Sequence, residues 1–218
     1  QKKGLKDPAM RQRLIDAAKN HIHKPNPAYA NAFNSAVDWD WFFPMTDALP
    51  PFKSMAALAA ETGKDPVELL VDMSIDSDFK LFFVDPANNE DLDVCIAMIN
   101  HPRTAVTFTD SGAHVTVTVN PVHTFLLGHW VRNAQAITIE AAIRKVTFDI
   151  AAFWGIQKRG LLREGWHADL CIFDLSTVKP QLPSLVHDLP TGAPRLLQKA
   201  DGILATIVNG EILIKDNQ

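Results

Sequence analysis

The sequence predicts an α/β fold, and two observations support this prediction. The first is a strand, a helix and a strand in order: an apolar run at residues 80–85, apolar residues at helical spacing over 88–99, and a second apolar run that begins at Arg103 and ends at Asp110. Such a unit normally has parallel strands and a right-handed crossover. The second is a change after Gly160 to short β segments.

The first part of the chain is predicted to be mainly helical. Asp7 and Pro8 favour a helix over residues 9–18, because Asp is a good N-cap and Pro suits the first helical position. Residues 21–27 interrupt the helical pattern, and two further helices are predicted over 55–61 and 66–73. Before the helix at 55–61, an aromatic cluster closed by Pro44 predicts a short strand or an edge of the core; its members are Trp39, Trp41, Phe42 and Phe43.

The last part of the chain is predicted to change from helices to strands. A helix is expected over 124–134, and Thr138 can cap another that starts at Ile139. Strands are expected over 168–173 and within 203–214, where Asn209 and Gly210 are typical of a two-residue hairpin turn. The sequence therefore predicts two domains, residues 1–160 and 161–218.

Asp110, at the end of the second apolar run, is the main candidate for chemistry. The β-branched and aromatic residues of that run predict a strand covered on both faces. An unpaired carboxylate buried there would cost several kcal/mol, so it must be neutralised, hydrogen-bonded or bound to a metal. From the residues alone, Asp110 could equally cap the turn that Ser111 and Gly112 begin.

Residues 108–114, Phe-Thr-Asp-Ser-Gly-Ala-His, carry a resemblance to a known family. They resemble the signature that ends the eighth barrel strand of the N-acyl-D-amino-acid deacylases (D-aminoacylases) in the amidohydrolase superfamily. The resemblance continues through residues 125–132, 139–147 and 159–174, and so covers about the last half of the chain. The ordered blocks make it more specific than the Gly-Ala-His motif alone.

This resemblance implies the carboxyl-terminal part of a metal-dependent (β/α)8 TIM barrel, followed by strands of a small β-sandwich whose first strands would lie upstream. The implied reaction is hydrolysis of a linear amide, an N-acyl-D-amino acid, with one or two Zn²⁺ ions. Asp110 would carry the proton from the attacking water to the leaving nitrogen, and it could also be a metal ligand. His114 and Ser111 are candidate substrate-binding residues, although Ser111 suits a tight turn better and His114 could instead bond to backbone.

Two other functions stay open at this point. Cyclic amidohydrolases such as hydantoinases and dihydroorotases reuse the acid at the end of the strand, so Asp110 cannot distinguish them. A non-catalytic half-barrel subunit could also dock onto a partner chain that supplies the rest.

The other histidines give weaker signals. His21 and His23 have the spacing of a metal pair, but they follow a helix end, so we interpret them as exposed loop residues. The remaining metal ligands are then expected outside this chain. His129 and Arg132 share a helix face and could line the mouth of the site, although a packed Trp130 with solvated polar neighbours is the preferred interpretation.

Length and composition limit the remaining possibilities. The 218 residues are fewer than the roughly 250 of a whole barrel, so a fragment, a processed chain or one part of a longer polypeptide is expected. With 21 Lys and Arg against 25 Asp and Glu, the chain has no basic run suited to nucleic acid. No apolar run approaches the roughly 18 residues of a membrane span, so a soluble, cytoplasmic protein is expected.

The expected partners follow from the same features. They are a small-molecule N-acyl amino acid and either the missing amino-terminal part of the protein or a companion chain, and a homo-oligomer stays open. Cys95 and Cys171 have no partner at metal spacing and are predicted to be two buried thiols in a reducing compartment.

Overall fold

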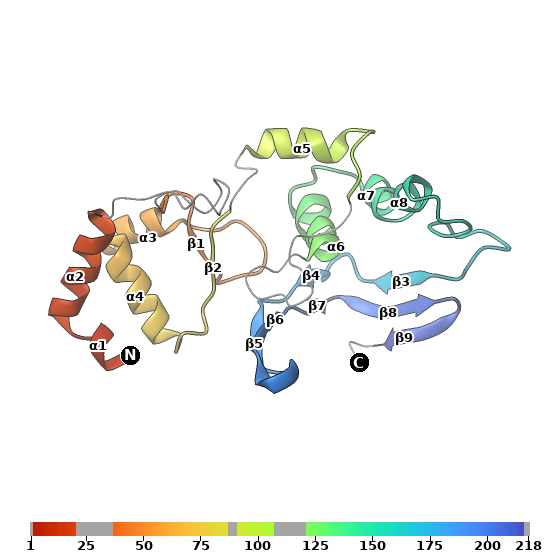
Figure 1. Cartoon of the computed structure of the whole chain (residues 1–218). Coiled ribbons are helices and arrows are strands. Elements are labelled where there is room, and N and C mark those ends of the chain that lie inside the picture. The colour runs from red at the N-terminus through yellow and green to blue at the C-terminus, as the bar shows by residue number, and fades with distance from the viewer. Residues whose placement is uncertain (1, 21–36, 87–90, 107–120, 216–218) are drawn as a thin grey trace. The chain divides into compact units, whose positions relative to one another are not determined.

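The computed structural model describes residues 2–20, 37–86, 91–106 and 121–215 (Figure 1). The chain forms two compact units. Unit 1 comprises Gln1–Thr46 and Pro51–Glu90, and unit 2 comprises Asp47–Pro50 and Asp91–Gln218.

Unit 1 is mainly helical, as predicted. Its elements are α1 (Lys2–Leu5), α2 (Pro8–Lys19), β1 (Phe43–Pro44), α3 (Met55–Thr62), α4 (Pro66–Asp76) and β2 (Phe83–Val84). Asp7 and Asp65 each cap a helix that begins with proline, and each side chain accepts a hydrogen bond of 3.0 Å from the backbone N–H two residues on. Gly63 ends α3 with a φ of 67°, which glycine adopts without strain.

The aromatic cluster forms the edge of the unit 1 core, as the sequence predicts. Met55 is fully buried with Ala59, and half-buried aromatic residues pack against them. The rings of Phe42 and Phe83 stack with their centroids 5.5 Å apart, and they bring β1 beside β2. The two strands pair antiparallel over two residues each.

The strand predicted over 80–85 is much shorter in the structure. Only Phe83–Val84 form β2, which is half-buried and antiparallel to β1, so the prediction of a long buried strand is wrong. The physical reason is that a strand needs a neighbour for its backbone hydrogen bonds, and β1 offers only two residues. The helix predicted next is confirmed as α5 (Leu92–Asn100), capped by Asp91.

The following run is also not a strand where it is described. Residues 103–106 are turn or irregular backbone, and the rest of the run lies outside the described residues. Every strand pairing in the described parts of the chain is antiparallel, and these parts form no closed barrel. The mixed helix and sheet content of the predicted α/β class is present.

The helical part of unit 2 contains one unexpected element. Its helices are α5, α6 (Val122–Phe125), the π-helix η2 (Leu126–Asn133), α7 (Ile139–Val146) and α8 (Phe148–Phe153). The helix predicted over 124–134 is present, but from Leu126 it has π geometry; near its end the Ala134 N–H donates to the His129 carbonyl five residues back, at 2.8 Å. Thr138 caps α7 as predicted, and its hydroxyl accepts from the Ala141 N–H.

The remaining strands form three small antiparallel sheets. Their elements are β3 (Leu170–Phe173), β4 (Lys179–Pro180), β5 (Ser184–Val186), the 3-10 turn η3 (Pro190–Gly192), β6 (Arg195–Leu197), β7 (Ala200–Asp201), β8 (Ile203–Val208) and β9 (Glu211–Lys215). The strand order is β3-β8-β9 in the largest sheet, and β4 pairs with β7 and β5 with β6. Asn209 and Gly210, with φ of 53° and 85°, join β8 to β9 in the predicted hairpin.

One buried core joins the helices and strands of unit 2. It contains Leu126, Leu127, Val131, Ile137, Ala142 and Val178, and Phe173 and Ile203 of the large sheet pack against it. The boundary expected after residue 160 refers to the domains of a whole enzyme, and it stays a prediction.

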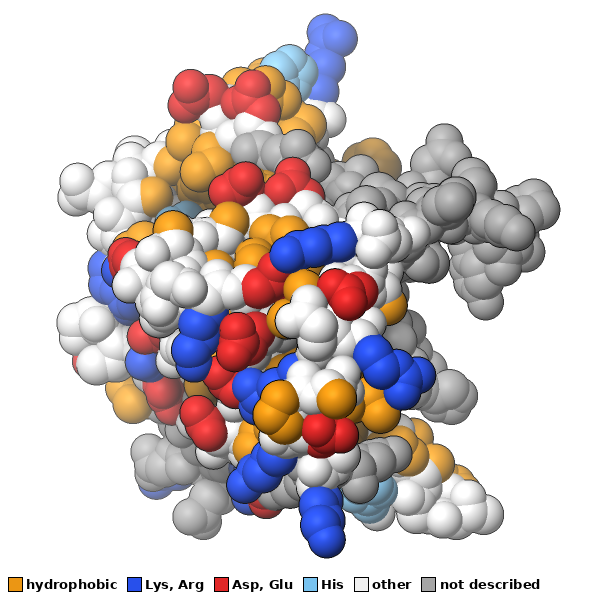
Figure 2. Space-filling model, turned by 90° about the vertical axis from the view of Figure 1, so that its left-hand side faces the viewer, with side chains coloured by type: hydrophobic (Ala, Val, Ile, Leu, Met, Phe, Trp, Pro, Cys, Tyr) orange, Lys and Arg blue, Asp and Glu red, His pale blue; other side chains and the backbone are white. Residues whose placement is uncertain are grey.

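The surface in Figure 2 has Lys and Arg side chains mixed with Asp and Glu, with no large area of one sign on the face shown. In unit 1 this mixture includes ion pairs, such as Arg11–Asp72 at 2.5 Å and Lys64–Asp72 at 2.6 Å. These pairs hold the pKa of Asp72 below its usual value, chiefly through the hydrogen bond from Lys64. None of the described helices is long and apolar enough to cross a membrane.

Candidate functional site

The residues with the strongest predicted roles fall in one segment. The candidate catalytic and possible metal-binding Asp110 and the candidate substrate-binding residues Ser111 and His114 lie between 107 and 120, outside the described residues. His21 and His23 also lie outside them. The structure therefore describes the residues that come before and after the segment 107–120. The contacts of these flanking residues show which parts of unit 2 they are bonded to.

The chain enters the Asp110 segment from a hydrogen-bonded turn. After α5, His101 to Thr104 form this turn, in which the Thr104 N–H donates to the His101 carbonyl at 3.2 Å. The Arg103 N–H donates to Nδ1 of His101 at 3.1 Å. The Thr104 hydroxyl can donate to the carbonyls of Met98 at 2.5 Å or His101 at 2.8 Å, so the turn is bonded back to the end of α5.

Two side-chain contacts fasten this turn to the rest of unit 2. Asn100 donates from Nδ2 to the Ala136 carbonyl at 2.9 Å. Lys145 of α7 donates from Nζ to the carbonyls of His101 and Thr104, at 3.0 and 3.1 Å. The entry to the Asp110 segment is thus tied to α7, which belongs to the buried core.

The chain leaves the segment at Pro121, which starts α6. The Phe125 N–H donates to the Pro121 carbonyl at 2.8 Å, and η2 follows directly. His129 of η2 lies with its ring centroid 5.1 Å from Phe125 and 4.7 Å from Trp130. Burial lowers the pKa of His129, so its neutral form is favoured. Its Nδ1 is buried and has no hydrogen-bond partner among the described residues.

Arg132 acts as a structural link in this arrangement. Its guanidinium donates from Nη1 to the carbonyls of Leu175 and Val178 at 3.1 and 2.6 Å. These bonds join η2 to the segment between β3 and β4. Trp130 packs against the core as predicted, but Arg132 is bonded to backbone carbonyls, so the prediction that it is solvated is wrong.

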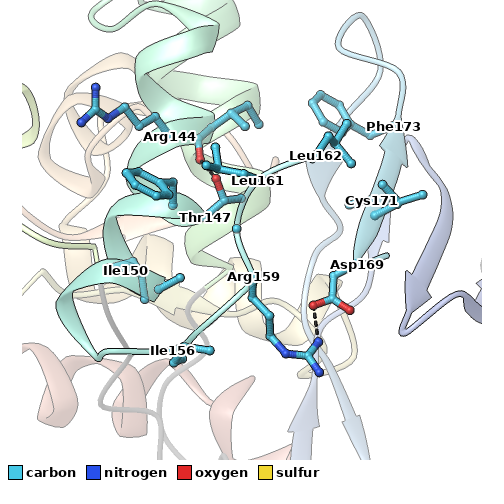
Figure 3. A pocket seen from close by; sticks show the side chains of 15 residues that line it. Arg144, Thr147, Ile150, Ile156, Arg159, Leu161, Leu162, Asp169, Cys171 and Phe173 are labelled. Carbon is cyan, nitrogen blue, oxygen red and sulfur yellow. Dashed lines mark hydrogen bonds and ion pairs between the residues drawn. The ribbon is translucent and has the colours of Figure 1, made fainter. Parts of the chain in front are cut away.

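A second link joins the loop after α8 to the start of β3 (Figure 3) and to the β8–β9 hairpin. Arg159 donates to the carboxylate of Asp169 and, at 2.7 Å, to the side-chain oxygen of Asn209. The Asn209 N–H also donates to Asp169, at 2.9 Å. The Asn209 N–H, followed by Arg159, holds the pKa of Asp169 below its usual value. Asp169 therefore has a structural role directly before β3, where it pairs with Arg159 and accepts from the Asn209 N–H.

A cavity of about 930 Å³ lies between α7, α8 and β3 (Figure 3). Apolar side chains supply most of its lining, among them Ile143, Ile150, Leu161, Leu162 and Phe173. Asp169 is the carboxylate among the described lining residues, and it is already paired with Arg159. The cavity thus lacks a set of residues for hydrolysis within the described part of the chain.

The described residues do not form a metal centre. They contain no group of three or more His, Cys, Asp and Glu side chains that could hold an ion. Cys95 is buried as predicted, whereas Cys171 is exposed, so the prediction of two buried thiols is wrong for Cys171. The reason is that the middle of β3 is uncovered on both faces, since Cys171 and the neighbouring Ile172 point to opposite faces and both are exposed.

The sequence interpretation missed Lys145 and the structural bonds of Arg132. One signal for Lys145 was present: it lies three residues after the fully buried Ala142 on a short helix, so both share a face. A lysine on a buried helix face needs acceptors for its ammonium group. The sequence could not show that these acceptors are carbonyls more than 40 residues away.

Comparison with known proteins gives a family match and three relatives. A family model described as the amidohydrolase family matches residues 7–214. An N-acyl-D-aspartate deacylase of Alcaligenes xylosoxydans xylosoxydans is 33% identical over 159 residues, which cover 68% of this chain and 29% of the relative. No solved structure matches the chain significantly.

The two other relatives come from the same organism. An N-acyl-D-glutamate deacylase is 38% identical over 87 residues, covering 40% of this chain and 16% of the relative. A D-aminoacylase is 35% identical over 85 residues, covering 39% and 16%. The chain therefore spans less than a third of the length of these curated relatives.

Proposed function

This chain belongs to the amidohydrolase family, and from that premise we propose that it is the carboxyl-terminal part of an enzyme that hydrolyses N-acyl-D-amino acids to a carboxylate and a free D-amino acid. The observation that carries the proposal is the family match over residues 7–214 together with relatives whose names all describe deacylation of D-amino-acid derivatives. The motif at 108–114 lies within the matched residues and points to the same family.

The proposed role of this chain in the reaction is proton transfer by Asp110. As a carboxylate, Asp110 would accept a proton from the attacking water and return it to the amide nitrogen as the carbon–nitrogen bond breaks. Asp110 gains and then loses one proton, so it is again a carboxylate when the reaction is complete. Ser111 and His114 would bind the substrate beside it.

We propose zinc as the cofactor of the whole enzyme, because the family resemblance implies one or two Zn²⁺ ions that activate water. The described residues do not by themselves fit such a site. As the family resemblance implies, we expect the histidine and carboxylate ligands to come from outside this chain, with Asp110 as a possible additional ligand.

We also propose that residues 1–160 belong to the barrel and 161–218 to a small β-sandwich. Exposed apolar side chains on the largest sheet support the second part. Ile212 and Leu213 of β9 are each 61% exposed, and Ile172 of β3 is 48% exposed. Exposed apolar side chains grouped on one sheet favour a further element that packs over that sheet. The upstream strands of the same protein or a companion chain would supply it.

The experiment that tests the function is a substrate panel with the full-length protein. N-acetyl derivatives of D-aspartate, D-glutamate and D-methionine should release acetate, and the matched L-isomers serve as controls. Hydantoin and dihydroorotate test the cyclic alternative. Turnover of a cyclic amide with none of the linear substrates would contradict the proposal, and the absence of any turnover would favour the non-catalytic subunit.

A further inference from the structure

Helix α2 of unit 1 has little apolar contact with its surroundings. Its buried residue is Ile15, and the apolar side chains of Met10 and Leu14 are only half-buried. Among the described residues, the core cluster of unit 1 around Met55 includes no residue of α2. Apolar packing therefore explains only a small part of how α2 is held.

Ion pairs join both ends of α2 to α4, the helix that lies beside it (Figure 1). Near the start of α2, Nη1 of Arg11 lies 2.5 Å from Oδ1 of Asp72. At the last residue of α2, Nζ of Lys19 lies 2.8 Å from Oδ2 of Asp65, the cap of α4. The start of α2 thus pairs with the second half of α4 and its end pairs with the beginning of α4, so the two helices run antiparallel.

The two carboxylates of α4 are well shielded from solvent and keep their charge. The side chain of Asp65 is 18% exposed and that of Asp72 is 22% exposed. Each has a second partner close to it in the sequence, since Asp65 accepts from the Val67 N–H at 3.0 Å and Asp72 lies 2.6 Å from Nζ of Lys64. Burial alone would raise the pKa of Asp65, but the hydrogen bonds from Lys19 and Val67 hold this pKa below its usual value. Both carboxylates are therefore ionised at neutral pH and are available to α2.

A helix held in this way responds to salt differently from an apolar core. The Debye length falls from about 10 Å in 0.1 M salt to about 3 Å in 1 M salt, so ion pairs near the surface are weakened. Burial of apolar side chains is not weakened by such screening. A helix of 12 residues that loses its neighbour is marginal in water, so a detached α2 would also lose its backbone hydrogen bonds.

We propose that α2 is an ion-latched strap, which detaches from α4 when its ion pairs to Asp65 and Asp72 are screened or removed, while the core of unit 1 stays folded. Detachment would uncover an acidic face of α4, because Glu68 lies between these two residues at helical spacing and is itself 4.0 Å from Arg11. This device belongs to unit 1 alone and does not depend on the proposed catalytic function.

The test is hydrogen exchange of the full-length protein at pH 7, followed in the peptide that covers residues 8–19. One exposed ion pair shifts such an equilibrium by about 1.5- to 5-fold, so loss of both pairs should accelerate exchange by about 2- to 25-fold. We expect this acceleration when NaCl is raised from about 0.1 M to about 1 M. Exchange in α3, whose Met55 and Ala59 belong to the core, should stay unchanged.

A double variant, Asp65→Asn with Asp72→Asn, tests the same pairs without salt. Asparagine is also a good N-cap, so the start of α4 is kept. Exchange at 8–19 should already be fast in 0.1 M NaCl, and 1 M NaCl should add less than about 1.5-fold. The matched control is Glu61→Gln, which removes the 2.8 Å pair between Lys53 and Glu61 elsewhere in unit 1 and should leave exchange at 8–19 unchanged.

Two results would overturn the proposal. One is exchange at 8–19 that neither salt nor the double variant accelerates. The other is an equal acceleration in α3, because unit 1 would then open as a whole. If the double variant does not fold, the salt comparison on the wild-type protein decides by the same two criteria.

Discussion

Gly128→Ala should destabilise unit 2, because η2 and the segment before β4 are in close contact at this glycine. A Cβ atom at Gly128 would lie 2.7 Å from the Val178 carbonyl oxygen and 3.1 Å from Cδ1 of Leu49. The first distance is too short for real atoms, so η2 or the Val178 backbone must move. That carbonyl also accepts the 2.6 Å hydrogen bond from Arg132, which the movement would lengthen.

The expected loss can be worked from these contacts. Overpacking of a core costs about 1–3 kcal/mol, and a weakened hydrogen bond from a charged donor adds up to about 1.5–3 kcal/mol. The better helix propensity of alanine offsets about 1 kcal/mol. We therefore expect the free energy of unfolding to fall by about 1.5–5 kcal/mol, measured by urea unfolding of the full-length protein with circular dichroism.

Two further variants serve as a control and as a test of additivity. Gly4→Ala is the matched control, because a Cβ at Gly4 of α1 meets no atom within 4 Å. Arg132→Met removes the bonds to Leu175 and Val178, and its effect should not add to that of Gly128→Ala, since both act on the same carbonyl. The reasoning is refuted if Gly128→Ala is as stable as Gly4→Ala.

Three other predictions remain, one on the link from Asp169 to the β8–β9 hairpin and two on the isolated chain. Because the folded pKa of Asp169 lies below its usual 3.8, its contribution to stability is present at neutral pH and is lost as the pH falls through the folded pKa. Asp169→Asn should therefore lower the melting temperature at pH 7 and lower it less near pH 3. The control is Glu164→Gln, which changes an exposed carboxylate. A fall in melting temperature that is equal at both pH values would contradict this prediction. The 218-residue chain alone should show no amidase activity with added zinc and should self-associate through its exposed strands, so turnover or a monodisperse monomer in light scattering would count against these two expectations.

Local features of this fold could be predicted from the sequence because neighbouring residues determine them. The caps at Asp7 and Thr138 depend on one side chain and the backbone two or three residues on. The hairpin at Asn209 and Gly210 depends on two residues that accept positive φ. In each case the interaction is complete within a few residues, so the residue pattern was sufficient.

Features that depend on distant partners could not be predicted in the same way. The run at 80–85 has the composition of a buried strand, but only Phe83 and Val84 find a partner in β1. The role of Lys145 depends on carbonyls of a turn that a helix face alone cannot identify. The catalytic role of Asp110 is predicted from its motif alone, and turnover of a variant at this position tests it.

The most direct test of the central claim is the turnover of the full-length enzyme with Asp110→Asn. This substitution keeps the size of the side chain and removes its basicity, and general acid and base assistance is typically worth about 10²- to 10⁴-fold. With N-acetyl-D-aspartate, N-acetyl-D-glutamate or N-acetyl-D-methionine as substrate, we expect kcat to fall by at least that order while bound metal, measured on the same sample, is retained. Near-normal turnover would contradict the catalytic role of Asp110, and a parallel loss of metal would instead make Asp110 chiefly a ligand.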